Sequence, residues 1–145
     1  MRILNLEGLH LVPSFRALGH EVLSLGPSQG CDVTLAEPLS TRALWELLEG
    51  RGFRPDLVFW CDLCRPPWVM GLETLPCAVV GLSVDQYCNP WHVPYSACFD
   101  AVLVAQRDYL RLFQDPRLPR PAQWTPLFCD PDMDYDRGAE RDIPV

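Results

Sequence analysis

The 145-residue chain is 48% hydrophobic and 21% charged, a balance typical of one soluble globular domain. Its net charge of −7 and pI of about 4.8 argue against a general nucleic-acid binder, which needs a basic surface. No apolar run approaches the roughly 18 residues of a membrane span, and the N-terminus lacks a signal-peptide cleavage site. We therefore expect a cytoplasmic protein without a membrane span.

The first third of the chain alternates short apolar runs with helix-like segments. "VPSFRALGH" predicts a helix that begins near Pro13 and ends at Gly19. "STRALWELLEGRG" predicts a longer helix, with Ser40 as its N-cap and leucines along one face. Strands are expected at residues 2–6, 21–26 and 31–35, the last of them a short edge strand.

The rest of the chain continues the alternation. "RPPWVMGLETL" predicts a short helix, "PWHVPYSACF" a turn or irregular helix, and "RDYLRLFQD" a helix. Strands are expected at residues 55–61, 77–85, 100–106 and 123–129. The pattern predicts an α/β fold: a Rossmann-like, doubly wound, mainly parallel sheet of six to seven strands with helices on both faces. Residues 1–129 form this domain, and the polar, turn-rich residues 130–145 are predicted to begin a linker.

The loop after the first strand, "LEGLHLVPS", does not have the glycine pattern of a phosphate cradle. It holds one glycine where a dinucleotide-binding loop has three, and no P-loop motif occurs in the chain. Gly8 either forms a plain tight turn or lets a ligand approach the backbone. We expect no nucleotide cofactor.

Polar and reactive side chains follow the predicted strands at their carboxyl ends, where ligands bind in open α/β sheets. Asp85 ends a very apolar strand, so its carboxylate either emerges into a cleft or caps the next turn. The candidate catalytic residues, chosen for this placement, are Asp85, His92 and His10. The candidate ligand-binding residues are Glu7, Gly8, Asp62, Arg65 and Gln86.

The seven cysteines are interpreted as free thiols rather than as a disulfide framework. A zinc site is the alternative, with Cys61, Cys64, Cys88 and His92 as ligands. The spacing of its second half is atypical, and a domain of this size needs no metal to fold, so we expect no metal. A Cys61–Cys64 redox pair is disfavoured because such a pair should open a helix. "DPDMDYD" lacks the glycine and glutamate of a calcium loop.

Three stretches resemble the N-terminal half of two-domain glycosyltransferases with the GT-B architecture, nearest to the CgeB-like spore-maturation group. They are "FRALGHEVLSL", "PDLVFWC", and "FDAVLVAQRDYLRLF" followed by "WTPLFCDPDMD". In that family the nucleotide-sugar site lies mainly in the second domain and the acceptor site mainly in the first. Asp85 and His92 match the position of the acceptor-side loop, although neither matches an invariant catalytic residue.

The resemblance implies the acceptor-binding half of a glycosyltransferase, inactive as an isolated fragment. "RDIPV" falls where the first strand of a donor-binding C-terminal domain would begin, so we expect the natural protein to continue past it. Such a fragment exposes surface that its partner domain covers, and we expect weak self-association. The alternative is a stand-alone α/β ligand-binding or receiver-like module. A receiver needs paired acidic residues after its first strand, where this chain has only Glu7.

Overall fold

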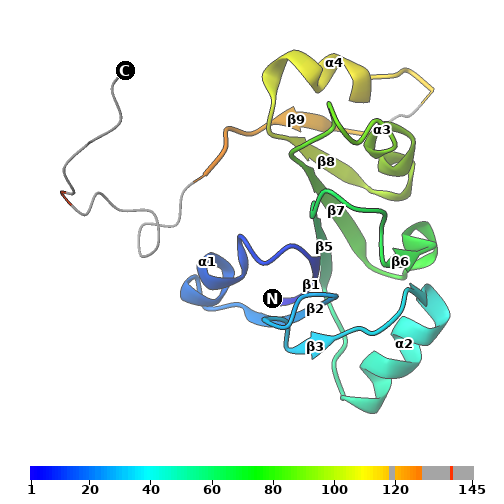
Figure 1. The fold of residues 1–145 in the computed structure, drawn as a ribbon. Coiled ribbons are helices and arrows are strands. Elements are labelled where there is room, and N and C mark those ends of the chain that lie inside the picture. The colour runs from blue at the N-terminus through cyan, green and yellow to red at the C-terminus, as the bar shows by residue number, and fades with distance from the viewer. Residues whose placement is uncertain (118–119, 129–137, 139–145) are drawn as a thin grey trace.

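The fold is a seven-stranded parallel sheet, seen in a computed structural model that describes residues 1–117, 120–128 and 138 (Figure 1). The strands follow one another in the order β3-β2-β1-β5-β7-β8-β9. This confirms the predicted doubly wound, parallel sheet of six to seven strands. The strands are β1 (Arg2–Glu7), β2 (Glu21–Gly26), β3 (Val33–Thr34), β5 (Leu57–Cys61), β7 (Ala78–Ser83), β8 (Ala101–Val104) and β9 (Ala122–Trp124).

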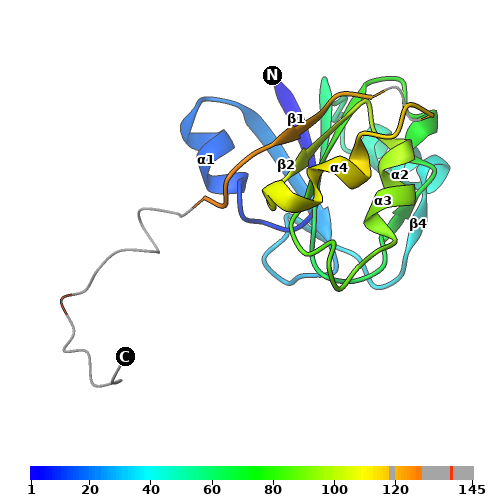
Figure 2. The same ribbon diagram turned by 90° about the horizontal axis from the view of Figure 1, so that it is seen from above.

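Helices cover both faces of the sheet. Helix α1 (Val12–Ala17) lies on one face, whereas α2 (Thr41–Gly50) and α3 (His92–Tyr95) lie on the other (Figure 2). The Ser40 hydroxyl accepts a hydrogen bond from the Ala43 amide at 3.3 Å, which makes Ser40 the predicted N-cap of α2. The remaining helical elements are α4 (Leu110–Phe113) and the 3-10 turns η1 (Leu72–Thr74), η2 (Ser96–Cys98) and η3 (Arg107–Tyr109).

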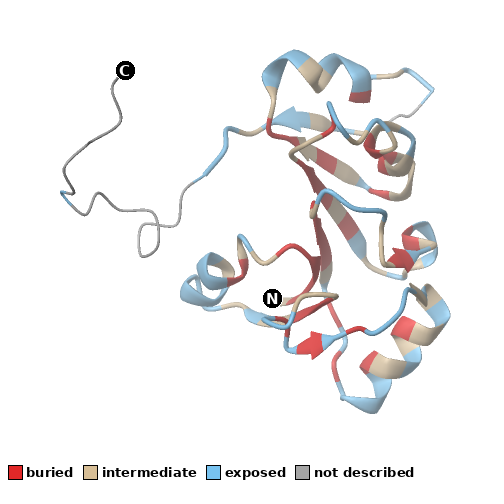
Figure 3. Ribbon diagram, viewed as in Figure 1, coloured by how far each residue is buried: buried red, intermediate tan, exposed pale blue. Residues whose placement is uncertain are grey.

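The two faces bury cores of different size. The α1 face holds a small cluster around Phe59 and Leu82, whereas the opposite face holds a large one that includes Trp60 and Phe99. The central strands are the most continuously buried part of the chain (Figure 3). Phe99 lies directly on the sheet because Gly81 has no side chain: a Cβ there would sit 2.2 Å from the Phe99 ring.

One predicted helix is wrong. Instead of a helix in "RPPWVMGLETL", the chain forms strand β6 (Val69–Met70), which pairs in parallel with β4 (Leu39–Ser40), and then the short turn η1. Gly71, at φ 88°, interrupts any helix that would run through this stretch. The last strand is also shorter than predicted, since it ends at Trp124. Apart from Gly138, the predicted linker lies outside the described residues, as does residue 129, the predicted end of the domain.

Candidate functional site at the carboxyl edge

Asp62 is the centre of a hydrogen-bond network at the carboxyl ends of β5 and β7. β5 and β7 are paired in parallel and end side by side, so the loops that follow them meet. Asp62 Oδ1 accepts the Cys64 amide at 2.7 Å, while Oδ2 accepts the amides of Val84 at 3.2 Å and Asp85 at 2.9 Å. Asp62 therefore ties the two loops together through their backbones.

The Asp62 carboxylate is stabilised in its charged form although it is only 4% exposed. Burial by itself raises the pKa of this carboxyl group. The His92 imidazole, whose Nε2 lies 3.4 Å from Oδ1, and the backbone amides oppose burial and bring the pKa below its ordinary value. A buried carboxylate with this many donors is a rigid structural element.

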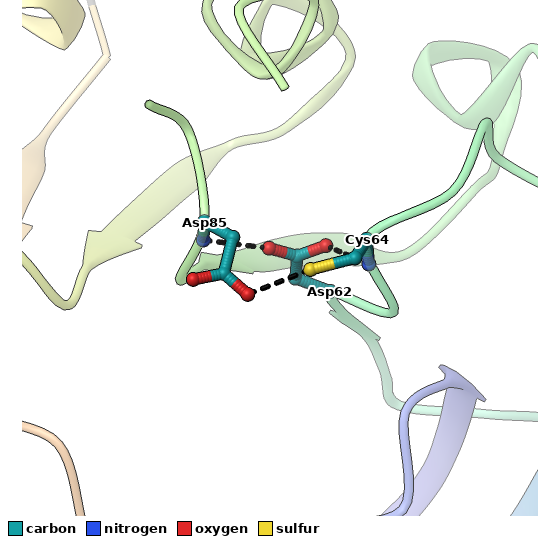
Figure 4. Close-up of side chains that lie close together, drawn as sticks. All are labelled: Asp62, Cys64 and Asp85. Carbon is teal, nitrogen blue, oxygen red and sulfur yellow. Dashed lines mark hydrogen bonds between the residues drawn. The ribbon is translucent and has the colours of Figure 1, made fainter. Parts of the chain in front are cut away.

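Asp85 presents a partly exposed carboxylate beside this centre. Its Oδ2 accepts a hydrogen bond from the Cys64 thiol at 2.6 Å, and Figure 4 shows the two side chains reaching toward each other past Asp62. The bond to Asp85, followed by burial, raises the pKa of the Cys64 thiol to about 12. Cys64 has a left-handed backbone at φ 54°, which is unusual for a residue other than glycine. Cys64 is therefore a proton donor to Asp85, and its thiol keeps its proton at neutral pH.

Glu7, the last residue of β1, is buried at 1% exposure under the loop that follows β5. Its left-handed backbone at φ 73° leaves the carboxylate where Oε1 accepts the Trp68 amide at 2.8 Å. Oε2 has no hydrogen-bond partner of standard geometry among the described residues, although the Trp60 indole N–H lies near enough to lower the pKa of Glu7. Burial raises the pKa of Glu7 to about 7, against the opposing effect of the Trp68 amide. Glu7 thus titrates near neutral pH.

His92 lies inside the protein at 1% exposure, behind Asp62. Its Nδ1 is 2.9 Å from the Ser83 hydroxyl, which donates to Gln86 Oε1 at 3.2 Å. Gln86 in turn donates to Gln106 after β8 at 3.3 Å. This chain of polar groups connects the ends of β5, β7 and β8. A molecule at the surface of this edge cannot touch His92, so its part is to position Asp62.

The other predicted site residues lie around this network without joining it. Gly8 is a packing requirement, because a Cβ there would lie 2.8 Å from Cys61 Sγ and 3.0 Å from the Asp62 carbonyl oxygen. His10 is exposed on the rim after β1, with its ring 6.2 Å from that of Phe128. Arg65 is exposed, and its charge weakly opposes the raised pKa of Glu7.

The four residues of the alternative zinc set do not form a ligand cluster within the described part of the chain. Cys61 is fully buried in the small core on the α1 face, whereas His92 packs against Trp60 on the opposite face. The group with suitable spacing is instead Asp62, Cys64 and Asp85, whose candidate ligand atoms lie within 4.8 Å of one another. Asp62 already accepts three amides, so coordination would have to break structural bonds.

Sequence reasoning missed Ser83 and Gln106 and gave Cys64 the wrong partner. Ser83 lies inside the mostly apolar run "CAVVGLSVD", so the sequence gives no reason to expect a polar network around it. Cys64 was considered with Cys61, its neighbour in the motif, whereas its real partner is Asp85 at the end of the next strand. The adjacency of β5 and β7 was the information that could have suggested this pairing.

A cavity of 420 Å³ lies at the opposite, amino edge of the sheet, away from these residues. Arg120, the basic residue among the described lining residues, donates to the carbonyl oxygens of Ser96, at 3.0 Å, and Phe99. Asp100, also in its lining, accepts the Val79 amide at 2.8 Å. Both side chains hold the backbone in place, so the concentration of partly free polar groups favours the carboxyl edge as the functional site.

Comparison with known proteins identifies no relative. No family model matches the chain, and neither a curated protein nor a solved structure matches it. Within the described residues, no helix has both the length and the apolar character needed to cross a membrane. The geometry of the carboxyl edge is therefore the basis on which a function is proposed.

Proposed function

We propose that this chain is the acceptor-binding half of a GT-B-type glycosyltransferase, and that the acceptor binds at the carboxyl edge. The observation that supports it is the Asp85 carboxylate, which is partly exposed and held in place by its own amide on Asp62. Ligands of open parallel sheets bind at this edge. A fixed carboxylate there suits a substrate whose reacting group is a hydroxyl.

Asp85 has the arrangement that a general base needs. One oxygen, Oδ2, receives the Cys64 thiol, while Oδ1 receives no donor from the described part of the chain. An acceptor hydroxyl can donate to Oδ1 and transfer its proton there as the oxygen attacks the sugar. The Cys64 hydrogen bond holds the carboxylate in one orientation during this step.

The two candidate histidines have different parts in this proposal. His10 is exposed on the rim, at the end of β1, where it can contact an acceptor. His92 is a positioning residue that acts through Asp62. We expect His10→Ala to weaken acceptor binding, whereas His92→Ala disturbs the loop that carries Asp85.

Among the described residues, no phosphate cradle is present for a donor nucleotide. The loop after β1 lacks a glycine-rich cradle, and Cys61 and Asp62 occupy the space beside Gly8. Transfer requires the acceptor and the sugar to be held together, and the leaving diphosphate requires electrostatic stabilisation. Residues 1–145 alone should therefore transfer no sugar.

The test is a binding screen with the 145-residue chain. Amide chemical shifts are recorded with a panel of mono- and disaccharides, and separately with UDP-glucose and GDP-mannose. We expect a saccharide to shift amides of residues 62–65 and 84–88, and Asp85→Asn to weaken that binding. The matched control is Glu49→Gln, an exposed carboxylate on α2, which should bind like the parent chain.

Three results would count against the proposal. Sugar transfer by this chain alone would place the donor site here, and tight binding of a nucleotide sugar at the carboxyl edge would do the same. Saccharides that shift only amides elsewhere would remove the acceptor site from this edge. In an enzyme that includes a donor domain, Asp85→Asn should lower turnover more than donor affinity.

A further inference from the structure

The two exposed thiols of the described chain both donate hydrogen bonds to the same residue, Asp85. Of six described cysteines, only Cys64 and Cys88 are exposed. The Cys64 thiol donates to Asp85 Oδ2 at 2.6 Å, and the Cys88 thiol donates to the Asp85 carbonyl oxygen at 3.4 Å. They come from the loops after β5 and β7, which are adjacent strands.

We propose that Cys64 and Cys88 form a dithiol modification site, which closes to a disulfide by exchange with a low-molecular-weight disulfide such as oxidised glutathione. The sequence motif suggests a different pair, Cys61 with Cys64. Cys61 is fully buried among the side chains of the α1 face, so neither a reagent nor the exposed Cys64 thiol reaches it. This proposal does not depend on the proposed function.

The contacts assign different parts to the two thiols. Cys64 is held as a protonated donor by Asp85, so it is a poor first nucleophile. The Cys88 thiol donates to a carbonyl oxygen rather than to a carboxylate, and the Asn89 amide donates to its sulfur at 3.7 Å. Cys88 therefore attacks first, and Cys64 is the resolving thiol.

The exchange balances in two steps. Cys88 loses its proton to solvent and attacks one sulfur of oxidised glutathione, forming a mixed disulfide and releasing a glutathione thiolate. Cys64 then passes its proton to Asp85 Oδ2 while its sulfur attacks the Cys88 sulfur, and a second glutathione thiolate leaves. One oxidised glutathione is consumed, and two reduced glutathione molecules and one intramolecular disulfide are formed.

Disulfide mapping tests this directly. The chain is incubated with oxidised glutathione, free thiols are blocked with N-ethylmaleimide, and the protein is digested with Asp-N and chymotrypsin. These proteases separate residues 62–68 from Cys61, and residues 88–91 from Cys98. We expect mass spectrometry to find these two peptides joined by a disulfide, with Cys61 recovered as a free thiol.

Variants separate the two steps. In Cys64→Ser the reaction should stop at the mixed disulfide between Cys88 and glutathione. In Cys88→Ser the Cys64 thiol should remain largely reduced. Asp85→Asn should accumulate the mixed disulfide and slow ring closure by at least about tenfold, because the amide cannot take the thiol proton. Cys98→Ser is the matched control and should leave the linked peptide unchanged.

A Cys61–Cys64 linkage, or glutathione on both exposed thiols without any linkage, would overturn the proposal. The wild-type map decides this without any variant, so a variant that fails to fold does not affect the outcome. Saccharide binding is measured separately. A failure of the dithiol site is thus distinguishable from a failure of the acceptor site.

Discussion

The two edges of this sheet use the same polar residue types in different ways. At the amino edge, Arg2 pairs with Glu21 at 2.9 Å, and its amide donates to exposed Asp56 at 2.8 Å. At the carboxyl edge, Glu7 and Asp62 are buried at 1% and 4% exposure. The backbone there is also left-handed at two non-glycine residues, Glu7 and Cys64.

The difference shows where the molecule gives up stability. Exposed ion pairs cost little to form and contribute little. Buried carboxylates and left-handed non-glycine residues each cost free energy and persist only where the surroundings hold them. This cost is concentrated at the edge that presents Asp85, as expected if that edge is selected for a function.

The largest effect should come from removing the buried carboxylate that holds the carboxyl edge together. Asp62→Ala leaves three backbone amides without their acceptor and removes the carboxylate that lies 3.4 Å from His92 Nε2. We expect a loss of about 3 kcal/mol or more in the free energy of unfolding, measured by urea denaturation. Asp56→Ala, which removes one exposed acceptor at the amino edge, should cost about 1 kcal/mol or less. Equal losses would mean that the two edges do not differ in this way.

Glu7 should make stability depend on pH. Burial raises its pKa from 4.5 to about 7, so the folded state binds its proton more tightly than the unfolded state does. Its contribution is fully present below about pH 4.5 and is lost as pH rises through 7, by about 3 kcal/mol in total. Glu7→Gln should remove this slope and be more stable than the parent chain at pH 8. A parent chain whose unfolding free energy is the same at pH 5 and pH 8 would contradict the assignment.

Two glycines provide a matched pair of smaller effects. Gly8→Ala at the carboxyl edge places a methyl group 2.8 Å from Cys61 Sγ, and we expect it to cost about 2 kcal/mol. Gly50 ends α2 with open space around its Cβ position. Gly50→Ala should stabilise the protein by about 0.5 kcal/mol. Thermal unfolding of both variants measures the difference, and a neutral Gly8→Ala would show that the loop after β1 yields easily.

The smallest effect should come from the amino-edge ion pair. Arg2 is partly exposed and Glu21 is exposed, so solvent and salt screen their attraction. We expect Glu21→Gln to change the urea midpoint by no more than the error of the measurement, at both 50 mM and 500 mM salt. A clear, salt-dependent loss would show that this edge also depends on charge.

The sheet was predictable because each of its main strands coincides with a short apolar run in the sequence. β1, β5 and β7 are buried on both faces, and their continuous apolar runs stand out from the helices between them. The pairing of β4 with β6 was not predictable, because two residues per strand carry no periodicity. The two prolines before β6 favour a helix start in the sequence, but in the structure they precede an extended strand.

The candidate site was predictable in position and only partly in its contacts. The carboxyl-end rule brings Asp62 and Asp85 together, and the structure places the Asp85 amide 2.9 Å from Asp62. The carboxyl-end rule does not reveal that His92 turns inward to Ser83, or that Glu7 is buried under Trp68, because both depend on how the loops pack. Exposure of a side chain is a tertiary property that residue order does not encode.

The brevity of the two outermost strands has a consequence for how copies of this protein meet. β3 has two residues and β9 has three, so each border of the sheet offers only a few unpaired backbone groups. A neighbouring molecule finds too little template there to add a strand of its own. Fibre-like stacking through the sheet borders is therefore discouraged by the fold itself, for a reason unrelated to surface charge.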